Sequence, residues 1–173
     1  TGRPVSAGTD VDIGTGVVPG VLSDDVRETI VRKTQRGTNL GTGGIGRFFL
    51  DLDTSISNVP LDGVILGDDM PVDSAGDPVF DIVRIIAGEW TPTVTAEIYI
   101  CCDNLGNEAL LRTVDGSTRV SIASSSFPAG FTSDNITNIE WRFTDTLPLT
   151  FMLLDEPEIL FTPIDGNGGQ TFT

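Results

Sequence analysis

Short runs in which apolar and polar residues alternate constrain this chain most. Clear examples cover Arg47–Asp53, Thr93–Cys102 and Ile139–Phe143. A period of two is that of a β-strand with one buried face, and no long stretch shows the apolar spacing of a helix. The 20 Gly and 10 Pro suit many short strands joined by turns. The sequence therefore predicts an all-β fold, an Ig-like or jelly-roll-like β-sandwich with extended Gly-rich terminal tails.

The strand pattern divides the chain into three parts. We expect an extended N-terminal arm over residues 1–25, a β-sandwich domain over residues 26–163 and a C-terminal tail over residues 164–173. The first strand of the sandwich is expected at Val26–Thr34, where apolar residues become denser.

Two glycine-containing segments call for an interpretation. Asp115-Gly116 separates the strand-like runs Ala109–Val114 and Ser117–Ile122, which predicts a β-hairpin. Gly41–Gly46 matches the G-x-G-x-x-G pattern of a dinucleotide-binding loop, but in such a site the loop is followed by a helix. The residues that follow alternate as a strand, so an inter-strand loop is expected instead.

The charge of the chain is strongly acidic. It has 25 acidic and 10 basic residues, a formal net charge of −15. Nucleic acids and anionic membrane surfaces attract clustered Lys and Arg, and no apolar run is long enough to span a bilayer. We therefore expect no nucleic-acid binding and no membrane insertion.

The N-terminal arm carries a weak strand pattern of its own. Val11, Ile13 and Val17 alternate with Asp12 and with glycines. One interpretation is a flexible leader. The other is an arm that adds a strand to the sheet of a neighbouring copy, which makes these three residues subunit contacts.

The residue types argue against catalysis. The chain has no His, so a Ser-His-Asp or Cys-His arrangement is impossible. Its many carboxylates leave no pair singled out for acid–base work. We expect the protein not to be an enzyme.

An acidic loop is the best candidate for a metal site. Asp68, Asp69, Asp73 and Asp77 fall within ten residues among Gly and Pro turns, and calcium prefers several converging oxygen ligands. A solvated acidic loop is the alternative. Two weaker clusters comprise Asp103, Asn104, Asn107 and Glu108, and Asp165 with Asn167.

The two cysteines are adjacent, at Cys101 and Cys102. Neighbours on a strand point to opposite faces, so Cys102 is expected inside and Cys101 outside, with Glu97 and Tyr99. One interpretation is a buried and a semi-exposed thiol. The other is that Cys101 forms a disulfide with a neighbouring chain.

The segment Phe48–Pro71 resembles the Ig-like repeat of prokaryotic surface proteins. The matching positions are Phe48, Leu50, Leu52, Asn58, Pro60, Leu61, Val64, Leu66, Asp68 and Pro71. The resemblance implies an extracellular spacer without a catalytic site. Some related domains carry a Lys–Asn isopeptide bond, for which Lys33 would supply the amine. The last strands expected here, Phe151–Leu154 and Glu158–Pro163, contain no Asn.

Three functional hypotheses follow. The first is a structural subunit or repeat of an extracellular filament, stalk or surface layer, a homopolymer joined through the terminal arm. The second is a surface adhesin or carbohydrate-binding module, with Trp90 as an exposed aromatic. The third is a virion decoration protein, which would share an all-β build and exposed tails.

Overall fold

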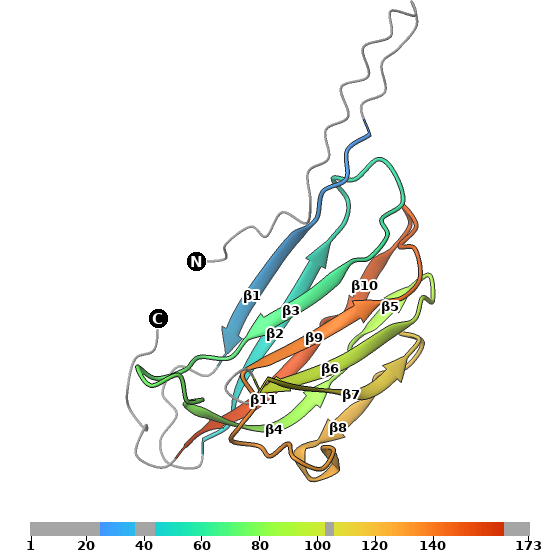
Figure 1. Cartoon of the computed structure of the whole chain (residues 1–173). Helices are drawn as coiled ribbons and strands as arrows, with labels where there is room; N and C mark the ends of the chain where they lie inside the picture. Colours follow the sequence, from blue (N-terminus) through green and yellow to red (C-terminus); the bar gives the residue numbers. More distant parts are fainter. Residues whose placement is uncertain (1–24, 37–43, 103–105, 165–173) are drawn as a thin grey trace, which may run out of the picture.

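Two antiparallel sheets face each other in a computed structural model that describes residues 25–36, 44–102 and 106–164 (Figure 1). The larger sheet has the strand order β1 (Ile30–Arg36), β2 (Gly46–Asp53), β11 (Glu158–Pro163), β4 (Phe80–Ile86) and β8 (Ser121–Ala123). The smaller sheet has the order β3 (Ile65–Asp69), β9 (Asn138–Phe143), β6 (Ala96–Cys102) and β7 (Asn107–Val114). The predicted all-β sandwich is confirmed.

The alternating residues create the two inner faces. Phe48, Leu50 and Leu52 of β2 are buried, as are Ile98 and Ile100 of β6. Because successive side chains of a strand point to opposite faces, each sheet supplies one apolar surface, and the two surfaces merge into a single core. No helix in the described part of the chain is long and apolar enough to cross a membrane.

Three phenylalanine rings pack against one another across the central strands of the larger sheet. The ring of Phe161 stacks on that of Phe48, with centroids 4.2 Å apart, and lies 4.5 Å from that of Phe80. These residues come from β11, β2 and β4, which are neighbours in the sheet. β11, the last of the described strands, therefore forms the middle of the sheet.

A short ribbon of β5 (Glu89–Thr91) and β10 (Met152–Asp155) extends the pairing of β4 with β11. Gly88 links β4 to β5 with a φ of 84°. A Cβ atom at this position would lie 2.8 Å from the carbonyl oxygen of Asp155. Glycine is required here because the two backbones approach closely.

Strand boundaries differ from the expected ones at two places. The first strand begins at Ile30 rather than Val26 and continues to Arg36. The segment Leu61–Leu66 also predicts a strand, but β3 begins only at Ile65, and Leu61 itself forms an isolated bridge to Leu147. Gly46 begins β2, so the glycine-rich motif leads into a strand as expected.

The hairpin predicted at Asp115-Gly116 is wrong. β7 pairs with β6 in the smaller sheet, whereas β8 pairs with β4 in the larger one. The turn therefore crosses from one sheet to the other. Gly116, at a φ of 73°, packs its bare Cα against the indole of Trp90, a long-range contact that a local turn pattern cannot indicate.

Candidate functional site

The four aspartates of the acidic loop are not brought together as metal ligands. Asp68 and Asp69 are consecutive in β3, so their side chains point to opposite faces. One carboxylate oxygen of Asp73, Oδ1, stabilises the turn that follows it. It accepts hydrogen bonds from the backbone N–H groups of Ala75 at 2.8 Å and Asp77 at 3.0 Å. Within the described residues, no three Asp, Glu or Cys side chains are placed to hold a metal ion. The geometry does not support the calcium interpretation at this loop.

Other predicted positions lie outside the described residues. These are the arm residues Val11, Ile13 and Val17, and the weaker acidic positions Asp103, Asn104, Asp165 and Asn167.

Cys101 shares the outer face of the smaller sheet with Glu108, as its strand position predicts. Its Sγ atom lies 3.8 Å from Oε2 of Glu108. Arg142 also binds Glu108 and Glu140, covering this face with an ion-pair cluster. Cys101 is nevertheless only 8% exposed. The expectation of a semi-exposed thiol is wrong, and this burial does not favour an inter-chain disulfide.

Trp90 was expected as an exposed aromatic, but it belongs to the core. Its exposed fraction is 1%, and its indole N–H donates to the carbonyl oxygen of Val94 at 2.9 Å. The ring also packs edge-on against Phe143. The carbohydrate-binding hypothesis thereby loses the side chain on which it depended.

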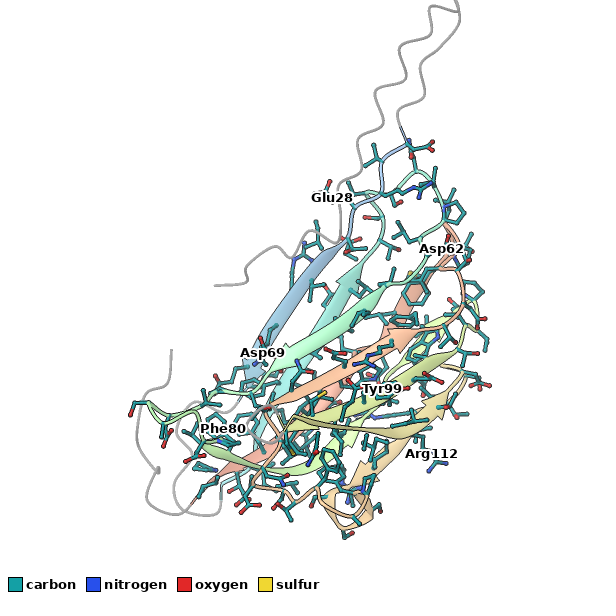
Figure 2. All side chains as sticks on the ribbon, viewed as in Figure 1. Glu28, Asp62, Asp69, Phe80, Tyr99 and Arg112 are labelled. Carbon is teal, nitrogen blue, oxygen red and sulfur yellow. The ribbon has the colours of Figure 1, made fainter. Side chains whose placement is uncertain are left out.

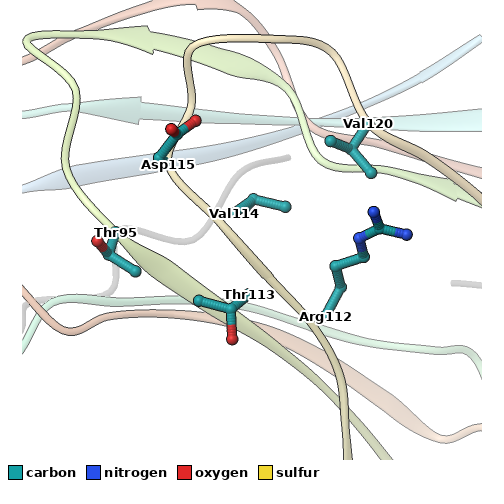
Figure 3. Close-up of a pocket in the computed structure, with 6 residues that line it drawn as sticks. All are labelled: Thr95, Arg112, Thr113, Val114, Asp115 and Val120. Carbon is teal, nitrogen blue, oxygen red and sulfur yellow. The ribbon is translucent and has the colours of Figure 1, made fainter.

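A shallow depression lies where β7 turns toward β8 (Figure 3). Its lining residues are Thr95, Arg112, Thr113, Val114, Asp115 and Val120. The Asp115 carboxylate accepts the hydroxyl of Ser117 at 2.7 Å and its backbone N–H at 3.0 Å. These bonds hold the pKa of Asp115 below its ordinary range. The carboxylate stabilises the turn and is poorly suited to proton transfer at neutral pH.

A basic edge strand is the most distinctive surface of the domain. Five of the ten basic residues of the chain fall between Arg27 and Arg47, where the only acid is Glu28. Three of them, Arg32, Lys33 and Arg36, lie on β1; we call these three the basic edge. β1 forms one margin of the larger sheet and β8 the opposite one (Figure 1). Sequence reasoning missed this edge, although the clustering of basic residues is visible in the sequence.

Arg32 and Arg36 lie on the outer face of β1. Nη1 of Arg32 is 3.2 Å from Oδ2 of Asp51 on β2, yet the Arg32 side chain remains 56% exposed. The guanidinium of Arg36 lies 4.6 Å from the centre of the Phe49 ring. Both cationic groups are therefore held extended over the sheet while staying open to solvent.

Lys33 points to the inner face and bridges the two sheets. Its Nζ atom lies 2.7 Å from Oδ1 of Asp68 on β3 and 3.9 Å from the centre of the Phe48 ring. It also donates to the backbone carbonyl of Asp69 at 3.4 Å, and Figure 2 shows Asp69 at the end of β3 nearest β1. The one lysine of the chain thus ties the margin of one sheet to the margin of the other.

Asp68 is the more deeply buried member of this pair. It is 6% exposed, and its second oxygen, Oδ2, has no hydrogen-bond partner in the described structure. Burial raises the pKa of Asp68, an effect only partly opposed by the positive charge of Lys33, and the Asp69 carboxylate adds a smaller increase. Desolvation of the carboxylate therefore outweighs its ion pair.

The raised pKa of Asp68 predicts a specific pH dependence. The folded chain binds a proton at Asp68 at a higher pH than the unfolded chain does. This carboxyl therefore favours folding increasingly as the pH falls through its raised pKa toward the ordinary value of 3.8. Asp68→Asn, which does not titrate, should lack this gain. We expect the free energy of unfolding of the wild type, relative to that of the variant, to rise between pH 7 and pH 3.5.

Urea unfolding of both proteins at each pH measures the difference. Comparison at equal pH cancels the opposite trends of carboxyls with lowered pKa, such as those of Asp53 and Asp145. Parallel curves for the two proteins across this range would contradict the prediction.

Comparison with known proteins gives no relative from which a function could be transferred. The chain matches no protein-family model, no curated protein and no solved structure at a significant level.

Proposed function

We propose that this chain is a non-catalytic structural subunit of an extracellular filament, stalk or surface layer. Its copies join when the N-terminal arm of one adds a strand to a sheet of the next. The assembly is a homopolymer that uses neither nucleic acid nor a membrane anchor within the sandwich.

The observation that carries this proposal is the open margin of the sandwich. β1 pairs on one side with β2, and no second strand lies along it among the described residues. Alternate N–H and C=O groups on the unpaired side of an edge strand are a template for another strand. A chain that offers both an alternating arm and an open edge has the two parts that strand addition requires.

The extracellular setting is supported by composition and by the resemblance of Phe48–Pro71 to surface-protein repeats. The chain has nine Arg but only one Lys, a bias that fits a protease-exposed or high-salt environment. Its net charge of −15 makes copies repel one another, so assembly requires a specific contact that overcomes this repulsion.

The apolar positions of the arm give the test. In the full chain, Val11, Ile13 and Val17 are all changed to Asp. We expect the wild type to form multimers whose size rises with protein concentration, and the triple variant to remain monomeric. A charged residue cannot occupy the buried face of an added strand without a large desolvation cost. Sedimentation velocity and electron microscopy measure assembly.

A control variant separates this effect from added charge. Thr1→Asp, Ser6→Asp and Ser23→Asp introduce the same number of charges away from the alternating segment. This variant should assemble like the wild type. The proposal is wrong if the wild type stays monomeric at all concentrations and salt levels, or if the Val11, Ile13 and Val17 variant still assembles.

A further inference from the structure

We propose that β1 is the acceptor edge, and that residues 10–17 of a second copy add to it with Asp10 and Asp12 beside Arg32 and Arg36. This inference rests on and deepens the proposed function, which draws on the open edge of β1 but does not state which strand of the neighbouring copy accepts the arm. It names both the surface and the chemistry of the partner segment.

β1 is the best acceptor among the margins of the described sheets. It has seven residues that pair with β2 without a register shift. β8 has three residues, as does β5, and β10 has four. The pairing of β7 with β6 shifts register between Ile98 and Tyr99, and such a bulge twists an edge away from further pairing. β3 ends in Asp68-Asp69, which would repel an acidic arm.

Charge complementarity identifies the arm as the partner. Asp10 and Asp12 alternate with Val11 and Ile13 in the sequence. Arg32 and Arg36 lie four residues apart on the outer face of β1. A carboxylate opposite Thr34 lies diagonally near both arginines, and one opposite Arg32 or Arg36 faces that arginine directly. Asp10 and Asp12 can occupy two such positions at once. They are two residues apart and the arginines four, so within each strand both side chains lie on the same face.

The parity of the arm matches the other face as well. With the two aspartates outward, Val11 and Ile13 fall on the inner face, beside Val31 and Lys33 of β1. That face lies beside the ion pair between the two sheets, in which Nζ of Lys33 is 2.7 Å from Oδ1 of Asp68. Two apolar side chains would extend the core past its present margin and shield this ion pair from water.

Two charge-reversed full-length chains test the contact. The arm-reversed chain carries Asp10→Lys and Asp12→Lys. The edge-reversed chain carries Arg32→Glu and Arg36→Glu. In each chain alone, like charges face each other across the proposed contact. We expect the concentration required for half-assembly to rise at least about tenfold for either variant by itself.

An equimolar mixture of the two chains is the decisive measurement. A lysine arm then faces a glutamate edge, and an aspartate arm faces an arginine edge, so alternating copolymers should form near the wild-type concentration. Sedimentation velocity with one chain fluorescently labelled reports hetero-association directly. Circular dichroism melting of each chain alone verifies that the sandwich is folded.

Each outcome has one meaning. Recovery of assembly only in the mixture supports the proposal. Unchanged assembly of the edge-reversed chain alone overturns it and places the acceptor on another strand. The proposed function then still stands if the Val11, Ile13 and Val17 variant fails to assemble. A concentration-independent drop in melting temperature for both variants, without rescue by mixing, also overturns it, because the arm then pairs with its own β1.

Discussion

Gly116→Ala should lower the free energy of unfolding by about 3–5 kcal/mol, a large part of the stability of a typical domain. A Cβ atom at this position would lie 2.1 Å from Cε2 of Trp90 and 2.2 Å from its Nε1. The indole cannot shift easily to make space, because Trp90 is only 1% exposed and its N–H donates a hydrogen bond to the carbonyl oxygen of Val94. Residue 116 also has a φ of 73°, which L-residues adopt at a further cost. Urea unfolding followed by circular dichroism measures the loss.

Gly63→Ala provides the matched control. Gly63 has a similar φ of 65°, but a Cβ atom there would meet nothing within 4 Å. Its substitution therefore isolates the backbone cost, about 1 kcal/mol. If the Gly116 variant is folded, its tryptophan emission should move to longer wavelength as the indole leaves its site. Equal losses for the two variants would show that the contact between Gly116 and Trp90 does not constrain the fold.

Phe161→Ala should cost about 4 kcal/mol, the second large effect expected for this domain. Phe161 is 0% exposed and lies at the centre of the ring cluster with Phe48 and Phe80. Removing its ring leaves a cavity between β2 and β4, which are held on either side of β11 and cannot close fully around it. The loss appears as a lower urea midpoint with an unchanged slope.

Phe131→Ala is the comparison for this second prediction. Phe131 packs against the same core but is only partly buried. The same deletion there removes less buried area and leaves no closed cavity, so about 1–2 kcal/mol is expected. A similar loss at both positions would mean that the ring cluster contributes no more than an ordinary rim contact.

Local patterns predicted the individual strands better than their connections. The alternation in Arg47–Asp53 corresponds closely to β2, because burial on one face leaves a period of two in the sequence. An Asp-Gly turn sequence such as Asp115-Gly116 is compatible both with a β-hairpin and with a crossover to the opposite sheet. In the folded chain this turn contacts Trp90, a residue distant in sequence, which a local pattern cannot indicate.

The candidate surface was harder to predict than the strands. Strand parity correctly placed Cys101 on the outer face but could not show that its thiol is buried there. The spacing of Asp68, Asp69, Asp73 and Asp77 resembles a ligand set only while their side-chain directions are unknown. The pairing of Lys33 with Asp68 joins residues 35 positions apart on different sheets, so no local pattern indicates it.

The central place of β11 bears on the order in which the chain can fold. During synthesis or export from the N-terminus, β2 and β4 emerge well before Glu158–Pro163, the strand that pairs with both. Until that strand arrives, no strand lies between β2 and β4 to join them, and the rings of Phe48 and Phe80 lack their common neighbour. Completing the larger sheet therefore requires a long-range pairing that can form only after its other described strands have been made. A subunit that lacks this strand would present β1 only on a two-stranded ribbon with β2, which is marginally stable by itself, so a firm acceptor edge depends on Glu158–Pro163.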